Sequence, residues 1–315
     1  MTALTGRLLG GPAALLGAVR ARLDPSAFHP ELRLHARLLP GRPVTALTLP
    51  LMRRLGDLIP EGRAEVFEIG EHVSVRVHRP ALAAAPGPAL LWIHGGGYVF
   101  GSARQNDRLC RTFANALNAV VAAVEYRLAP EHPYPAALDD CYDALQWLGA
   151  QPEIDPERIA VAGASAGGGL AAALAFAARD RGGVRPVLQV LSYPMLDDRS
   201  TGAELETGTF RLWNTAANRF GWRAYLRGAD PAAAVPARRT DLAGLAPAWI
   251  GVGTLDLFHA EDLAYAERLR AAGVEVRVLE VPGAFHGFDE VAADTGVARD
   301  YIAAQVVSLR AALTA

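Results

Sequence analysis

The chain has 315 residues, a formal net charge of −2 and 51% hydrophobic residues, enough to bury a sizeable core. This charge balance lacks the basic footprint of nucleic-acid-binding proteins, so we expect no nucleic-acid partner. All 31 basic residues are arginine, and the lack of lysine excludes a phosphate-binding P-loop. Cys110 and Cys141 form no CxxC or metal-binding pattern, which indicates buried free thiols in a reducing compartment, and we expect the cytoplasm.

Two apolar segments could be mistaken for membrane or export signals. Residues 159–178 carry no charge, but glycines interrupt their middle, so we expect a buried strand followed by a buried helix, with no membrane span. Residues 8–19 are apolar and follow Arg7, yet charge returns at Arg20 and no clear small-x-small cleavage site precedes it. We expect an amphipathic helix packed on the surface there, in place of a signal peptide.

Eight strands are predicted along the chain. Residues 65–68 and 72–77 alternate about Gly70 and Glu71, as in an antiparallel hairpin at a sheet edge. Continuous apolar runs predict six further strands buried on both faces: residues 89–93, 120–124, 159–162, 187–191, 248–252 and 274–281. Helical patterns separate several of them, over residues 107–117, 136–148, 168–179 and 261–272. This alternation predicts an α/β fold with an eight-stranded, mostly parallel sheet flanked by helices.

Two long segments interrupt the alternation. Residues 1–58 precede the first strand, and residues 195–246 separate two strands without containing one. Because long insertions often serve as lids, we expect residues 195–246 to form a helical cap over a core made of residues 59–194 and 247–315. The rings of the insertion form either the small core of the cap or the wall of a pocket, and the pattern leaves both interpretations open. Our candidate pocket residues are Tyr98, Phe210, Trp213, Leu257 and Phe285.

Ser165 lies between a strand-like run and a helix-like run, in the sequence Gly-Ala-Ser-Ala-Gly. Small neighbours on both sides permit the sharp, strained strand-to-helix turn that exposes a nucleophilic serine. The alternative is a serine that merely packs. The context of strand, turn and helix favours the nucleophile.

The expected partners of Ser165 follow later strands, because ligands of an open α/β sheet bind beyond the carboxyl ends of its strands. Asp256 follows the strand at residues 248–252, and His286 follows the last strand within a glycine-flanked loop. His286 would accept the serine proton, and Asp256 would orient the imidazole and stabilise its charged form. Glu261 and Asp262 are rival acids, but their helical position suggests solvated or capping residues.

Three glycines follow His94 at the end of the strand at residues 89–93. Such a run lets backbone N–H groups approach a ligand closely, as the developing oxyanion of an acyl transfer requires. We assign this role to the N–H groups of Gly95, Gly96 and Ala166; the alternative is a flexible glycine turn. The glycine clusters do not match the dinucleotide-binding pattern GxGxxG, and we expect no metal site.

Together, HGGG from His94, residues 126–131 (YRLAPE), the GxSAGG run around Ser165, an aspartate and a final His-Gly-Phe resemble the bacterial hormone-sensitive-lipase-like esterases. The resemblance implies an α/β-hydrolase fold with a helical cap made of residues 1–58 and the insertion, no metal or organic cofactor, and short-to-medium acyl esters as substrates. It also implies that homodimers can form and that residues 126–131 brace the serine turn. The sequence departs from the usual family pattern at Ala164, at Gly169 and in the segment after Asp256. These departures bear on which subfamily the chain resembles, and they leave the three catalytic candidates unchanged.

Three other functions use the same features. An amidase or deacetylase would employ the same residues, and sequence does not separate it from an esterase. A ligand-binding receptor on this fold can lose the histidine, and the presence of His286 argues against it. A general lipase needs a large apolar entry, which the arginines of the insertion disfavour.

Overall fold

The computed structural model describes residues 25–39, 44–60, 62, 64–81, 86–201 and 209–314. The helix predicted over residues 8–19 lies outside these ranges. Among the helices within them, none combines the length and apolar character needed to cross a bilayer. The uncharged run at residues 159–178 is a strand that leads into a helix, as predicted.

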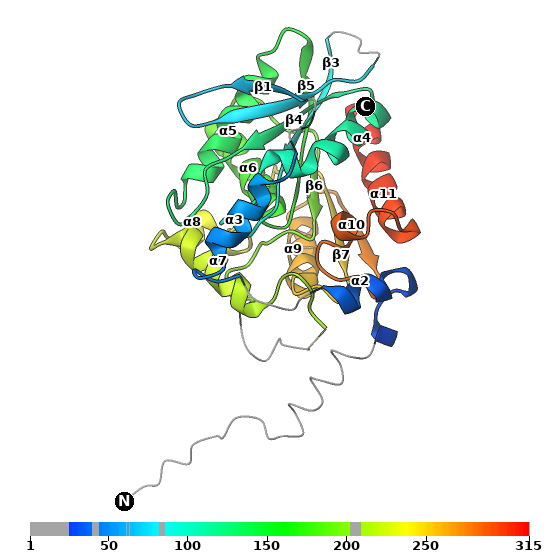
Figure 1. Ribbon diagram of the computed structural model, residues 1–315. Helices are drawn as coiled ribbons and strands as arrows, with labels where there is room; N and C mark the ends of the chain where they lie inside the picture. The colour runs from blue at the N-terminus through cyan, green and yellow to red at the C-terminus, as the bar shows by residue number, and fades with distance from the viewer. Residues whose placement is uncertain are drawn as a thin grey trace, which may run out of the picture.

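One eight-stranded sheet runs through the molecule, in the order β1-β2-β4-β3-β5-β6-β7-β8 (Figure 1). β2 pairs antiparallel with β1 and with β4, and the remaining neighbours are parallel, which confirms the predicted edge hairpin and the mostly parallel sheet. The strands are β1 Glu65–Glu68, β2 Ser74–His78, β3 Gly87–Ile93, β4 Val120–Glu125, β5 Ile154–Ala164, β6 Gln189–Ser192, β7 Ala248–Gly253 and β8 Val276–Val281. The predicted strand ends shift by a few residues, because ladder pairing and not hydrophobicity decides where a strand begins.

Alternate residues of the central strands enter two separate cores. In β3, Leu91 and Ile93 belong to one cluster, whereas Leu90 and Trp92 belong to the other. This follows from the two-residue period of a strand, which sends successive side chains to opposite faces. A sheet covered on both faces therefore needs strands that are apolar throughout, as observed here.

Helices cover both faces of the sheet (Figure 1). α4 (Asp107–Leu117) and α11 (Gly296–Leu313) contribute to the core on one face. On the other face lie α5 (Ala136–Gly149), α6 (Ala166–Arg181) and α9 (His259–Ala271). The four predicted helices are present, with ends that differ by a few residues.

The remaining helices come from the N-terminal region, the insertion and the C-terminal loops. They are η1 Pro25–Ala27, η2 Pro30–Leu32, α2 Arg33–Leu38, α3 Leu49–Asp57, η3 Ala103–Asn106, α7 Thr215–Leu226, α8 Pro231–Ala234, η5 Pro236–Arg238 and α10 Phe288–Val291. The described part of the insertion is helical, as expected. The buried Arg211 joins the insertion to the N-terminal region, because its guanidinium donates to the Ala36 carbonyl (2.6 Å) and lies over the Phe28 ring. That these pieces act as a cap with the predicted boundaries stays a prediction.

Candidate active site

Ser165 occupies a sharp turn between β5 and α6. Its backbone has φ 56° and ψ −120°, a conformation that is costly for a residue with a side chain. The Ser165 N–H donates to the Ser192 carbonyl (2.9 Å), and the Ser165 carbonyl accepts from the Met195 N–H (2.9 Å). A Cβ added at Gly163 would overlap the backbone of Gly167, so the small neighbours predicted from the sequence are a steric requirement of the turn.

The structure brings Ser165, His286 and Asp256 together. His286 Nε2 lies 2.9 Å from Ser165 Oγ, and His286 Nδ1 lies 2.8 Å from Asp256 Oδ2. Because a carboxylate only accepts, Nδ1 carries the proton and Nε2 is left as the acceptor for the serine hydroxyl. The other carboxylate oxygen, Asp256 Oδ1, accepts from the Phe258 N–H (2.9 Å), which fixes the carboxylate plane.

Backbone hydrogen bonds hold the Asp256 and His286 loops against each other at the carboxyl ends of β7 and β8. The Thr254 N–H donates to Val281 (3.1 Å), and the Leu255 N–H donates to Ala284 (3.0 Å). In return, the Gly283 N–H donates to the Thr254 hydroxyl (2.9 Å). The two loops therefore form one unit, and the distance between acid and base follows from strand pairing.

Aromatic rings surround the His286 imidazole. Tyr193 meets it at 67° with centroids 4.9 Å apart, and Phe258 meets it at 85° and 5.1 Å. Trp213 from the insertion lies 6.5 Å away. Ser165 and His286 each keep 6% of their surface exposed, so the reacting atoms lie in a largely water-free environment where electrostatic interactions are strong.

The glycine loop after β3 lies beside the serine turn. A Cβ added at Gly95 would lie 3.1 Å from the Ala164 carbonyl oxygen and 3.4 Å from Ser165 Cβ. In the part of the chain that the structure describes, the N–H groups of Gly95 and Gly96 have no backbone or side-chain acceptor. Ala166 is the first residue of α6, where N–H groups lack an intrahelical acceptor. The three predicted donors thus lie near Ser165 with unused N–H groups.

The ring of His94 orients this loop, a role that sequence reasoning missed. Its Nδ1 lies 2.7 Å from the Gly95 carbonyl oxygen, and its ring stacks on Tyr126 at 4.2 Å. Burial lowers the pKa of His94 to about 4, so the ring is neutral and its Nδ1–H donates to Gly95. Since the peptide is planar and trans, holding the Gly95 carbonyl on one side directs the Gly96 N–H to the other. Tyr126 also donates its hydroxyl to the His94 carbonyl (3.0 Å).

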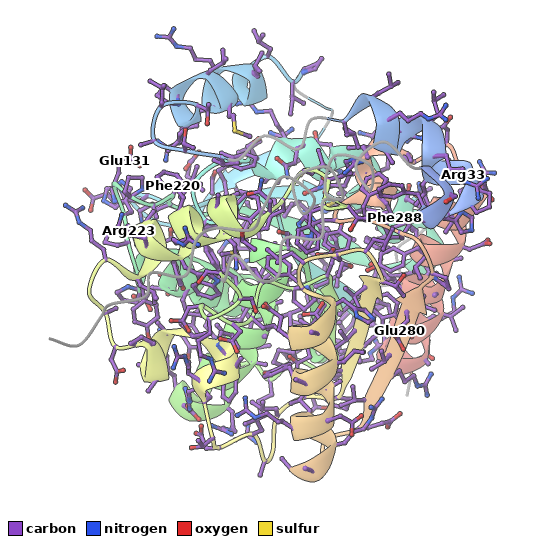
Figure 2. All side chains as sticks on the ribbon, turned by 90° about the horizontal axis from the view of Figure 1, so that it is seen from below. Arg33, Glu131, Phe220, Arg223, Glu280 and Phe288 are labelled. Carbon is purple, nitrogen blue, oxygen red and sulfur yellow. The ribbon has the colours of Figure 1, made fainter. Side chains whose placement is uncertain are left out.

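Helix α7 of the insertion packs directly on the glycine loop. A Cβ added at Gly97 would overlap the Trp213 indole. A Cβ added at Gly221 of α7 would crowd the Gly97 carbonyl. Trp213 Nε1 donates to Asn218 (3.2 Å), and Asn218 donates to the Ser200 carbonyl (2.7 Å). In the view from below, Phe220 and Arg223 of α7 lie near Glu131 (Figure 2). The blue helices α3 and α2 lie along the upper edge of the same view.

The five candidate pocket residues have different environments. Trp213 lies beside His286, as described above, and Leu257 is buried next to the Asp256 turn, while Phe210 is half-buried. The Tyr98 ring stacks on Tyr225 at 4.1 Å and its hydroxyl donates to the Met195 carbonyl (3.2 Å). Phe285 is fully buried and packs edge-on against Phe28, so its ring belongs to the core.

The expectation that Glu261 and Asp262 are solvated or capping residues is wrong. Glu261 is buried, and its Oε1 accepts from the N–H groups of Leu196 (2.8 Å) and Asp197 (3.0 Å). Asp262 has no exposed surface, and within the described residues its carboxyl oxygens have no hydrogen-bond partner. Burial raises the pKa of Glu261 to about 8 and that of Asp262 well above its ordinary value. Helical position alone did not reveal that this face of α9 packs against the sheet.

Several known proteins that are similar to this chain are named as esterases or ester hydrolases. The family described as alpha/beta hydrolase fold matches residues 90–290. Carboxylesterase NlhH of Mycobacterium tuberculosis is 36% identical over 297 residues, which cover 87% of this chain and 91% of NlhH. Ethyl acetate hydrolase of Pseudomonas putida is 37% identical over 236 residues, covering 70% of this chain and 72% of that enzyme. The solved structure of a bacterial heroin esterase has a TM-score of 0.81 and 36% identity, and covers 91% of this chain and 98% of its own. The chain belongs to the α/β-hydrolases, in the family of the hormone-sensitive-lipase-like esterases.

Proposed function

We propose that this protein is a serine carboxylesterase that cleaves esters of short-to-medium acyl chains through an acyl-enzyme intermediate. The observation that carries the proposal is the hydrogen-bonded chain from Ser165 through His286 to Asp256, beside unused backbone donors. Such a chain activates a hydroxyl that is otherwise a weak nucleophile at neutral pH.

In the acylation step, Ser165 Oγ attacks the ester carbonyl carbon while its proton passes to His286 Nε2. Asp256 Oδ2, hydrogen-bonded to Nδ1 at 2.8 Å, holds the imidazole in place and stabilises the imidazolium without taking the proton. The imidazolium then donates its Nε2 proton to the leaving alcohol, which leaves the acyl group on Ser165.

In the deacylation step, His286 acts again as the base. It accepts a proton from water while the water oxygen attacks the acyl carbon, and it returns the proton to Ser165 as the acid departs. In both steps the carbonyl oxygen gains negative charge. The N–H groups of Gly95, Gly96 and Ala166 would stabilise this charge, and one such donor contributes about 10²–10³ in rate.

The position of Trp213 supports a short acyl group. The indole lies between the Gly97 loop and His286, and its hydrogen bond to Asn218 fixes it there. A rigid ring so close to the triad limits the room beside the acyl carbon. The similar enzyme of Pseudomonas putida is named for ethyl acetate, an ester with a two-carbon acyl group.

Two further proposals concern the setting of the enzyme. Cys110 and Cys141 are free and buried, which fits a reducing compartment, and we retain the cytoplasm as the predicted location. The homodimer implied by the family resemblance also stays a prediction.

Hydrolysis of p-nitrophenyl esters from acetyl to palmitoyl, with Ser165→Ala measured in parallel, tests the proposed function. We expect activity on the short members that disappears in the variant. Equal hydrolysis by wild type and Ser165→Ala would refute the proposal. A folded wild-type protein that cleaves an acyl anilide but none of the matched esters would show an amidase instead.

A further inference from the structure

The buried acid Asp289 is linked to His286 through the ring of Tyr193. Asp289 is the third residue after His286, belongs to α10 and keeps only 7% of its surface exposed. Its Oδ1 accepts a hydrogen bond of 2.7 Å from the Tyr193 hydroxyl, which is also buried. Tyr193 is the ring that meets the His286 imidazole with centroids 4.9 Å apart.

Tyr193 is held in a conformation that its surroundings must maintain. It follows β6 with φ 36°, in the left-handed region that side-chain-bearing residues rarely adopt. Its backbone N–H donates to the Gly251 carbonyl (2.6 Å), which fixes one end of the residue, and Asp289 fixes the hydroxyl at the other end. The ring between these two anchors forms one wall of the space that His286 occupies.

We propose that Asp289 is a positioning residue for the catalytic base: its carboxylate anchors Tyr193, which holds the His286 imidazole in line with Ser165, and its negative charge stabilises the imidazolium. This proposal rests on the proposed function, because it assigns a role within the same catalytic cycle. Asp256 would then act directly on His286 Nδ1. Asp289 would act through the Tyr193 ring, and its charge would act on the imidazolium through space.

The charge state of Asp289 changes in the working range of such an enzyme. Burial, reinforced by the neighbouring Glu290, raises the pKa of Asp289 to about 7 against the opposing effect of the Tyr193 hydrogen bond. Asp289 also lines a groove of about 1020 Å³ between α4 and α11, through which its proton can exchange with solvent. The titratable and charged groups around it are Tyr193, His286, Glu290, Tyr301 and, along the groove, Arg108, Asp294, Arg299 and Arg310.

The ionisation gives a test that separates positioning and charge from a purely structural role. Asp289→Asn keeps an acceptor for the Tyr193 hydroxyl but removes the charge. Wild type and Asp289→Asn should therefore have similar kcat at about pH 5.5, where Asp289 is protonated. Their kcat ratio should rise to on the order of tenfold at about pH 8.5, where only the wild type carries the charge. A ratio that stays constant with pH would overturn the charge role.

Tyr193→Phe tests the anchoring role, because it keeps the ring and removes only the hydroxyl. We expect kcat to fall on the order of tenfold with little change in KM, since a misaligned base slows the chemistry more than it weakens binding. At about pH 5.5, where Asp289 carries no charge, combining Tyr193→Phe with Asp289→Ala should cost little more than either change alone, because both break the same hydrogen bond. Wild-type kcat in Tyr193→Phe, or independent effects of the two changes, would overturn the anchoring role.

Two controls keep this test separate from the proposed function and from misfolding. Glu290→Gln removes the adjacent charge, which is hydrogen-bonded to Asn106 and leaves the Tyr193–Asp289 hydrogen bond in place, and should lower kcat at about pH 8.5 clearly less than Asp289→Asn does. The rate at which a p-nitrophenyl phosphonate labels Ser165 reads the same base without any ester turnover. If wild type hydrolyses no ester, the pH-dependent labelling ratio still decides the role of Asp289, and the two proposals fail or hold separately.

Discussion

The Trp213 indole lies against the backbone of Gly97, so closely that a Cβ at Gly97 would overlap the ring. The same indole is 6.5 Å from the His286 imidazole. One side chain of the insertion thus touches the glycine loop after β3 and approaches His286, so we expect the shape of the acyl site to depend on the position of α7.

Trp213→Ala should therefore widen the acyl site. We expect kcat/KM to fall for acetyl esters, which lose a packing partner, and to rise relative to wild type for longer acyl chains. A p-nitrophenyl ester ladder measures this change. Trp147→Ala on α5 serves as the control, because its ring packs against Phe67 and does not meet the triad. An unchanged ladder in Trp213→Ala would show that the ring does not limit the acyl group.

Asp256→Asn should lower kcat on the order of 10⁴-fold, because an amide at this position favours the wrong tautomer of His286. KM should change little, since Asp256 is fully enclosed and does not reach the substrate. Asp262→Asn is the matched control: burial raises the pKa of this acid, and within the described residues its carboxyl has no hydrogen-bond partner to lose, so the isosteric amide should leave kcat unchanged. Similar losses in both variants would contradict a specific role for Asp256.

Gly95→Ala should lower kcat about 10²–10³-fold, because the new methyl group lies 3.1 Å from the Ala164 carbonyl and 3.4 Å from Ser165 Cβ. The resulting shift would move the N–H donors away from the reacting carbonyl. Gly70→Ala in the edge hairpin meets nothing within 4 Å and should behave as wild type in the same steady-state assay. Full activity in Gly95→Ala would remove this loop from the mechanism.

Stability should depend on the buried ion pair between Arg76 of β2 and Asp107 of α4. Asp107 accepts two hydrogen bonds from Arg76, at 2.9 and 2.7 Å, and lies 3.3 Å from His78. Asp107→Asn should lower the free energy of unfolding by about 3–5 kcal/mol, because it removes the carboxylate that accepts two hydrogen bonds from the buried Arg76. Denaturant unfolding at neutral pH measures this loss. Glu267→Gln, which breaks the exposed pair with Arg270, should change it by less than about 0.5 kcal/mol.

The same pair predicts an acid limb of the stability curve. Burial raises the pKa of Asp107, but the Arg76 hydrogen bonds outweigh it and hold the pKa below the ordinary value of 3.8. A carboxyl with a lowered folded-state pKa stabilises the fold above its unfolded pKa, and this contribution is lost as the pH falls through the folded value. The wild type should therefore lose more stability than Asp107→Asn between about pH 4 and pH 2. Parallel curves over this range would contradict the assignment.

The sheet, and the positions of the candidate nucleophile, acid and base, could be predicted from the sequence because they depend on local patterns. Apolar runs mark the strands, and parallel strands bring their carboxyl ends together, so residues that follow different strands meet. Ser165, Asp256 and His286 all occupy such positions. Of the eight histidines, His286 is the one in a glycine-flanked loop after the last strand, which is why it could be chosen as the candidate base.

Properties that depend on packing between distant segments could not be predicted. Glu261 and Asp262 are acids in a helix, a pattern typical of solvated residues, yet both are buried, and the loop after β6 donates two N–H groups to Glu261. The pocket prediction combined Trp213, which lies 6.5 Å from the His286 ring, with Phe285, whose ring is part of the core. The pair of Tyr193 and Asp289 joins residues 96 positions apart. Asp289 does follow a strand-end loop as Asp256 does, and that shared position was the available signal.

Labelling with a p-nitrophenyl phosphonate, followed by peptide mapping, tests the central claim most directly. The reagent transfers its phosphonyl group to an activated serine and releases p-nitrophenol, while the serine proton passes to the base. We predict one phosphonyl group per chain, on Ser165, with none in Ser165→Ala and a much slower reaction in His286→Ala. Labelling of a different residue, or an equal rate in His286→Ala, would contradict the claim that His286 activates Ser165.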